Sequence, residues 1–138
     1  MILSKPSSNG GYRKNDIGPR VLVVDDIAML RNALREALEE GGMRVIAEAG
    51  NGREAVLLYE AHKPDVVLLD ITMPVMDGLE ALRRIKKRDP RARVVMCSAM
   101  NGQRYLVRAV QLGARDFIVK PFKKSRIISA VRKAAEEV

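Results

Sequence analysis

The stretches VLVVDD (residues 21–26) and DVVLLD (residues 65–70) are short apolar runs that end in aspartate. Two later runs have the same form, because RVVMCS (93–98) ends in a hydroxyl group and DFIVK (116–120) ends in an ammonium group. Continuous apolar runs of this length, closed by a polar residue, are typical of buried parallel strands. These four runs therefore indicate a sheet whose polar groups gather at one edge.

Helical patterns separate the apolar runs. Between residues 27 and 40, apolar side chains recur at helical spacing until Gly41 and Gly42 end the pattern. The sequence predicts strands over 21–26, 43–49, 65–70, 91–98 and 114–120, and helices over 27–40, 52–62, 79–88, 101–113 and 125–136. Repeated units of this kind predict an α/β fold, (βα)5, a doubly wound parallel five-stranded sheet with helices on both faces.

Three carboxylates follow two of the predicted strands. Ligand sites of open α/β sheets lie outside the carboxyl ends of the strands, so Asp25, Asp26 and Asp70 are expected to meet there. Clustered carboxylates repel one another and are costly to bury. A hard divalent cation removes that cost, and all-oxygen ligands suit magnesium better than zinc.

Asp70 has the features of a nucleophile. It ends the most uniformly apolar run and precedes a loop whose shape Pro74 and Gly78 constrain. A carboxylate held in this way can accept a phosphoryl group as an acyl phosphate. Lys120 and Ser98 would then supply an ammonium and a hydroxyl group for the phosphoryl oxygens.

Each of these residues also has a simpler interpretation. Asp25 or Asp26 is expected to cap the following helix, Lys120 could be a solvated strand end, and Ser98 could be a turn residue. A shared site is preferred, because otherwise five polar residues would end these runs by coincidence.

The segments VLVVDD, DVVLLDITMPVMDG, VVMCSAM and GARDFIVKPF resemble the receiver domain of bacterial two-component response regulators. The wording DITMP, CSAM and DFIVKPF is especially similar to the CheY-like single-domain chemotaxis type. The resemblance covers residues 20–138 and implies a flavodoxin-like fold with strand order 2-1-3-4-5. Residues 1–19, rich in Ser, Gly, Pro and Asn, are expected to form a flexible N-terminal extension.

The resemblance also assigns roles to the site residues. It implies that Asp70 is the phosphoacceptor and that Ser98 and Lys120 hold the phosphoryl group. It implies that Asp26, Asp70 and the carbonyl of Thr72 bind Mg²⁺ directly, with Asp25 acting through water; Mn²⁺ could substitute. The Lys120–Pro121 peptide would be cis.

A conformational switch follows from the same resemblance. Ser98 would move toward the phosphoryl group, and Phe117, where the family often has tyrosine, would turn into the vacated space. The altered surface would run from Asn101 to Ala134. Thr72 and Met100 would face the attacking water. Because Met100 cannot orient water, the acyl phosphate is expected to be long-lived.

The resemblance implies that a sensor histidine kinase or a phosphotransfer protein donates the phosphoryl group, that a downstream protein reads the switch, and that chemotaxis is the pathway. The receiver half of a larger regulator, a phosphorelay intermediate and, more distantly, an aspartate-nucleophile phosphatase are the alternatives. The chain stops where the last predicted helix ends, which favours a free-standing switch. A monomer is expected, with dimerisation on phosphorylation as the alternative.

Composition limits the other classes of function. The net charge of +8 invites a nucleic-acid interpretation, but residues 1–20 account for +3 of it. The densest basic run, 83–93, lies at a predicted helix end, where Lys and Arg oppose the macrodipole, and no aromatic residues interleave it. No direct nucleic-acid contact is therefore expected. No run could span a bilayer, and the lone Cys97 fits a reducing cytoplasm.

Overall fold

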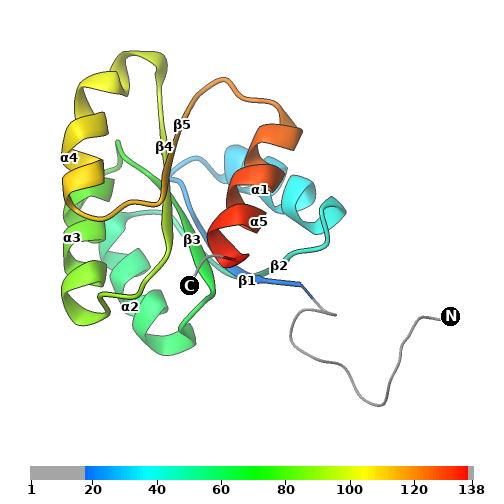
Figure 1. Ribbon diagram of the computed structural model, residues 1–138, viewed down its shortest axis with the longest axis horizontal. Helices are drawn as coiled ribbons and strands as arrows, with labels where there is room; N and C mark the ends of the chain where they lie inside the picture. The colour runs from blue at the N-terminus through cyan, green and yellow to red at the C-terminus, as the bar shows by residue number, and fades with distance from the viewer. Residues whose placement is uncertain (1–17, 137–138) are drawn as a thin grey trace, which may run out of the picture.

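The computed structural model describes residues 18–136, without the side chains of Met100, Asn101 and Gln103. Strands and helices alternate along this part of the chain (Figure 1). In chain order they are β1 Arg20–Val24, α1 Ala28–Glu40, β2 Arg44–Ala49, α2 Gly52–His62, β3 Val66–Asp70, α3 Gly78–Arg88, β4 Val94–Ser98, the 3₁₀ helix η2 Met100–Tyr105, α4 Leu106–Gln111, β5 Asp116–Val119 and α5 Lys124–Glu136.

All the strand pairs are parallel, and the sheet has the order β2-β1-β3-β4-β5. The predicted flavodoxin-like topology is therefore confirmed. A crossover between parallel strands needs a long connection, and here each one contains a helix. Because β1 and β3 are neighbours, the two aspartate-ending runs lie side by side in the centre of the sheet.

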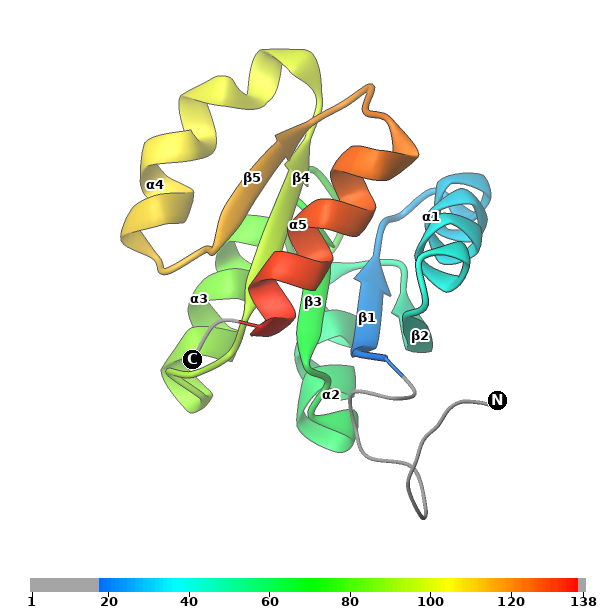
Figure 2. The same cartoon turned by 45° about the vertical axis from the view of Figure 1, so that its right-hand side comes forward.

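Alternate residues of each strand enter two separate cores. Helices cover both faces of the sheet, with α1 and α5 on one face (Figure 2). On one face, Leu22, Leu69 and Met96 pack against α2, α3 and α4. On the other face, Val23 and Leu68 pack against α1 and α5. The central strand β3 is buried along its whole length, which explains why it reads as an uninterrupted apolar run.

Most predicted elements are slightly longer than the observed ones, and three differ most. The predicted strand over 91–98 begins only at Val94, because Asp89 caps α3 and a turn follows it. The predicted strand over 114–120 shortens to Asp116–Val119. The predicted helix over 101–113 divides into η2 and a six-residue α4, which Leu112 and Gly113 end. Single-sequence patterns locate elements better than they locate element ends.

Contacts near the start of the described chain stabilise the opposite edge of the sheet, where β1 and β2 begin. The N–H of Arg44 donates to the carbonyl of Pro19 at 2.8 Å, so the main chain already pairs with β2 before β1 begins. The guanidinium of Arg20 donates to the carbonyls of His62 and Lys63. Most of the predicted extension, residues 1–17, lies outside the described residues.

Candidate functional site

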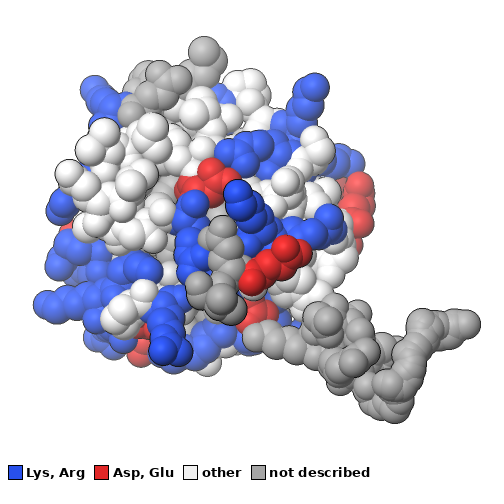
Figure 3. All heavy atoms as spheres, in the orientation of Figure 1, with Lys and Arg blue, Asp and Glu red and all other residues white. Residues whose placement is uncertain are grey.

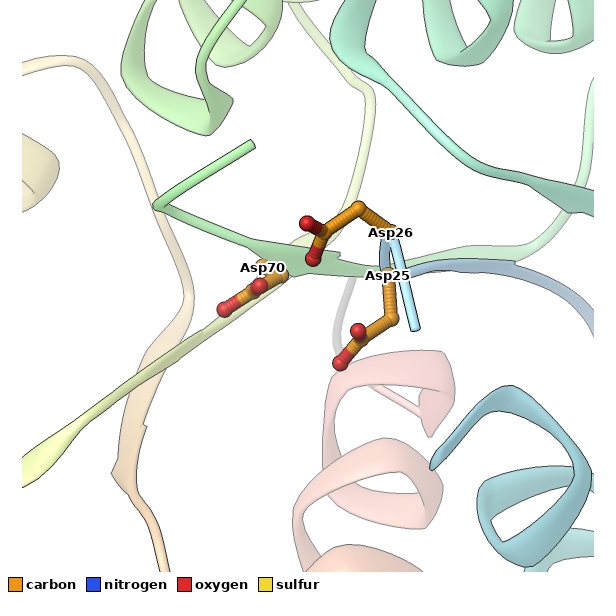
Figure 4. Close-up of side chains that lie close together, drawn as sticks. All are labelled: Asp25, Asp26 and Asp70. Carbon is orange, nitrogen blue, oxygen red and sulfur yellow. The ribbon is translucent and has the colours of Figure 1, made fainter. Parts of the chain in front are cut away.

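Three carboxylates converge at the carboxyl ends of β1 and β3 (Figure 4). Asp70 is the last residue of β3, and Asp25 and Asp26 follow directly after β1, whose Val24 pairs with Leu69. Each of the three offers an oxygen atom within 4.8 Å of the others. Asp25 and Asp70 are buried, whereas Asp26 is exposed. The predicted convergence is confirmed.

Lys120 brings a positive charge to this cluster from the end of β5. Its Nζ lies 3.0 Å from Asp25 Oδ2 and 3.3 Å from Asp70 Oδ1. Its main-chain N–H donates to the carbonyl of Ser98 at 2.7 Å, and the Lys120–Pro121 peptide is cis, as predicted. Burial works to lower the pKa of Lys120, but the bonds to Asp25 and Asp70 outweigh it and raise the pKa. The ammonium therefore stays charged at neutral pH.

The pKa of Asp70 is raised from 3.8 to about 6. Burial is the largest cause, Lys120 works against it, and the charges of Asp25 and Asp26 add to it. At neutral pH the carboxylate is mostly ionised, yet it is poorly solvated compared with one at the surface. A poorly solvated carboxylate loses little hydration energy when it forms a new bond. This property suits a nucleophile.

The donor set fits a hard divalent cation. All three side chains offer oxygen, and one ammonium cannot neutralise three carboxylates. Asp26 is open to solvent, so a cation can enter and keep several waters, as Mg²⁺ requires. Residues that could hold such an ion are therefore Asp25, Asp26 and Asp70.

Both carboxylate oxygens of Asp25 accept hydrogen bonds. Its Oδ1 accepts the N–H of Ile27 at 2.9 Å, and its Oδ2 accepts Lys120. The expectation that Asp25 or Asp26 caps the next helix is wrong, because Ile27 is the N-cap of α1 and no side chain caps that helix. The Asp25 carboxylate instead bonds within the loop before the helix.

Arg31 is a supporting residue that the sequence analysis missed. Its guanidinium donates to the main-chain carbonyl of Asp25 at 2.6 Å and pairs with Glu48 of β2 at 3.3 Å. It therefore ties the β1–α1 corner, which carries two of the carboxylates, to the neighbouring strand. An arginine one turn into a helix has no distinctive signal in a single sequence, because most such residues are solvated.

The loop after Asp70 is shaped by its own backbone. The N–H of Gly78 donates to the carbonyl of Ile71 at 2.7 Å, and a Cβ at position 78 would collide with the carbonyl of Asp70. Val75 adopts a φ of 70°, which is rare for a β-branched residue. Asp77 then caps α3 by accepting the N–H of Glu80. The loop is thus closed back onto β3, which holds Asp70 in place.

Comparison with known proteins agrees with this geometry. The family model described as the response regulator receiver domain matches residues 21–132. The chain belongs to the response regulator receiver family. It is 48% identical to the chemotaxis protein CheY of Thermotoga maritima over 87% of this chain and all of that one. It is 50% identical to CheY of Bacillus subtilis, over 83% and 95% of the two chains.

A solved structure gives the same result for the receiver fold. The CheX–CheY–BeF3–Mg²⁺ complex of Borrelia burgdorferi matches with a TM-score of 0.83 and 36% identity, over 88% of this chain and 92% of that chain. The predicted family is therefore confirmed, and the aspartate-nucleophile phosphatase is no longer needed as an alternative. No helix in the described part of the chain is long and apolar enough to cross a membrane.

Other predicted residues of the receiver site lie at different distances from its centre. Ser98 ends β4 and is buried, but its hydroxyl donates to the carbonyl of Ala99 at 3.2 Å. Thr72 is exposed in the loop after β3. Phe117 is half-buried on β5 and packs against the core on the α3 and α4 side. The Met100 side chain lies outside the described residues.

Cys97 takes no part in this receiver site. It faces the core under α1 and α5, and burial raises the pKa of its thiol to about 12. The thiol is therefore protonated and unreactive at neutral pH, as its place in an apolar run predicted.

Proposed function

We propose that this receiver domain is a phosphorylation-activated switch that accepts a phosphoryl group on Asp70. The observation that carries the proposal is the juxtaposition of a buried nucleophilic carboxylate, two further carboxylates and the Lys120 ammonium at one edge of the sheet. The family and the relatives named CheY support a role in chemotaxis. The chain would act in the cytoplasm.

Transfer from a phosphohistidine is the reaction that the site suits. An oxygen of Asp70 forms a bond to phosphorus while the bond from phosphorus to the imidazole nitrogen breaks, and the imidazole leaves with the electron pair. Lys120 already donates to Asp70 and would donate to an oxygen of the transferred group. Ser98, at the end of the neighbouring strand β4, would donate to another oxygen. The domain would thus assist its own phosphorylation rather than act as an enzyme on other substrates.

Mg²⁺ would be held by Asp26, Asp70 and the main-chain carbonyl of Thr72, with Asp25 acting through water. The indirect role of Asp25 is supported by its two oxygens, which already accept Ile27 and Lys120. When bound, the ion would offset charge on the phosphoryl oxygens. Mn²⁺ offers similar oxygen chemistry and could substitute.

The surface that reads the switch would be formed by α4, β5 and α5, within Asn101–Ala134. Leu106, Val107 and Val110 of α4 are exposed, which is unusual for three neighbouring apolar side chains. Figure 3 shows uncoloured surface over α4, while lysine and arginine cover much of the rest of that face. An apolar strip with a basic surround fits a partner segment that is apolar in the centre and acidic at its edges.

The switch itself would couple Ser98 to Phe117. Phe117 of β5 pairs with Met96 of β4, and it packs against the same core as Tyr105 and Leu112. Lacking a hydroxyl group, it would respond through packing alone. The predicted slow hydrolysis, which Thr72 and Met100 would control, belongs to this proposal.

Phosphorylation with acetyl phosphate tests the function directly. The protein is incubated with acetyl phosphate and Mg²⁺, and the modified residue is located by peptide mapping. We expect modification on Asp70, with none in Asp70→Asn and the parent level in Asp77→Asn. Asp77 is the matched control because it is a carboxylate in the same loop, and asparagine keeps its helix cap. Modification elsewhere, or in Asp70→Asn at the parent level, would overturn the proposal.

A further inference from the structure

The hydroxyl of Ser98 rests against the turn that begins η2. Ser98 Oγ donates to the carbonyl of Ala99 at 3.2 Å, and the N–H of Gly102 donates to the same carbonyl at 2.8 Å. Gly102 is buried, and a Cβ built on it would overlap Ser98 Oγ and lie 2.9 Å from Ser98 Cβ, so an alanine there requires the hydroxyl to leave and the turn to shift slightly. The hydroxyl therefore occupies the place that a side chain at position 102 would fill.

In this resting position the Ser98 hydroxyl donates to Ala99, and Lys120 donates to Asp70. The ammonium of Lys120 lies 3.3 Å from Asp70, while the Ser98 hydroxyl is engaged with its own turn. A serine side chain has three staggered positions, and one of them is available here only because residue 102 is glycine. The φ of Gly102 lies outside the left-handed region, so its backbone alone does not require glycine there.

We propose that Gly102 is a positioning residue that holds the Ser98 hydroxyl in its resting state, and so sets how readily the site accepts a phosphoryl group. The inference rests on the proposed function. A protein whose binding-competent state is only partly populated binds its ligand more weakly by that fraction. An alanine at position 102 removes the resting position of the hydroxyl and thereby raises the population of every other arrangement, including the one that meets the phosphoryl group.

Beryllofluoride with Mg²⁺ is the probe, because it mimics a phosphoryl group on a carboxylate. Its affinity is measured by calorimetric titration for the parent, Gly102→Ala, Ser98→Ala and the double variant. We expect Gly102→Ala to bind about tenfold more tightly than the parent, equivalent to about 1.4 kcal/mol. In the Ser98→Ala background the gain should be absent, because no hydroxyl remains to be displaced and only the close contact between the two Cβ atoms is left.

Gly50→Ala is the matched control. Gly50 directly follows β2, and a Cβ there would meet its nearest neighbour, the Arg31 guanidinium, at an ordinary 3.5 Å. This variant should bind beryllofluoride as the parent does. Equal or weaker binding by folded Gly102→Ala would overturn the inference, and so would an equal gain in the Ser98→Ala background.

A second measurement needs no substitution at position 102. Three-bond couplings in the parent report the χ1 angle of Ser98 with and without beryllofluoride. We expect the angle to change on binding, and an unchanged angle contradicts the inference. Failure of the parent itself to bind, or parent-like binding by Asp70→Asn, would instead contradict the proposed function, so the two failures are distinguishable.

Discussion

At the scale of single residues, the proposed phosphoacceptor Asp70 lies where burial and neighbouring carboxylates disfavour its charged form. Asp70 is buried beside Asp25 and Asp26, and Lys120 opposes the resulting rise in its pKa. The folded protein therefore holds a proton on Asp70 more tightly than the unfolded chain does. Folded protein without a bound cation carries a cost for keeping this carboxylate ionised.

Replacing Asp70 should expose that cost. Because the folded pKa of about 6 exceeds the ordinary value of 3.8, stability is lost as pH rises through this window. Asp70→Asn cannot ionise, so without Mg²⁺ we expect it to be more stable than the parent at pH 8, by roughly 1–3 kcal/mol. Near pH 4 the two proteins should be similar.

Urea unfolding at the two pH values measures this difference. Asp77→Asn serves again as the control, since Asp77 is exposed and the asparagine retains the cap. An Asp70→Asn protein that is less stable than the parent at pH 8 would show that the Lys120 contact outweighs the burial of the carboxylate.

At the scale of elements, α2 is joined to the turn after α3 by one polar contact. Tyr59 of α2 is buried and donates its hydroxyl to Asp89 at 2.7 Å. Burial, followed by the bond to Asp89, raises the pKa of Tyr59, while the Tyr59 hydrogen bond is the largest cause that lowers the pKa of Asp89. The contact is thus strongest when Asp89 is ionised.

We expect Tyr59→Phe to lower stability at pH 7 by about 1 kcal/mol, the usual worth of one hydrogen bond. The folded pKa of Asp89 is lowered, so its contribution is present above the ordinary value and lost as pH falls through the folded value. The difference between parent and variant should therefore shrink below about pH 4. Thermal unfolding across this range checks it, and a constant difference would mean that ring packing alone is responsible.

The η2–α4 segment should be the least protected helical region of the described chain. Its α-helical part has six residues, its N-cap has no side-chain hydrogen bond, and Val107 and Val110 are exposed. Amide hydrogen exchange should be faster in Leu106–Gln111 than in Gly78–Arg88, whose first turn Asp77 caps. Equal protection of the two segments would contradict this prediction. It would also weaken the proposal that α4 belongs to the surface altered by the switch.

At the scale of the whole molecule, a cation at the site would join segments that lie far apart in the chain. Asp25 and Asp26 follow β1 and Asp70 ends β3, so one ion bound to them would join two neighbouring strands of the sheet and add to its stability. A ligand that binds only the folded state raises the midpoint of unfolding in proportion to the logarithm of its concentration.

Mg²⁺ should therefore raise the unfolding temperature of the parent, and less so at low pH. Protons and the cation compete for Asp70, so the stabilisation should decline as pH falls through about 6. Thermal scans with Mg²⁺ and with Na⁺ at matched ionic strength separate the specific effect from screening. Asp70→Asn should lose most of the Mg²⁺ effect, and a pH-independent rise in the parent would place the cation elsewhere.

The order of elements and the members of the site were readable from sequence. A β3 run buried on both faces must be apolar throughout, and the residues that end such runs must reach the same edge when the strands are parallel. Asp25, Asp26, Asp70 and Lys120 could be found in this way because topology alone brings them together.

Only the tertiary structure decided how those groups contact one another. The Asp25 carboxylate accepts the N–H of Ile27 rather than capping α1, and the Asp25 carbonyl accepts a hydrogen bond from Arg31. The Ser98 hydroxyl lies beside Gly102. These contacts depend on side-chain rotamers and on the exact course of the loops. Hydrophobic periodicity does not encode either of them. Periodicity reports which face of an element is buried, whereas the position of a hydroxyl or a guanidinium is set by neighbours that are remote in sequence.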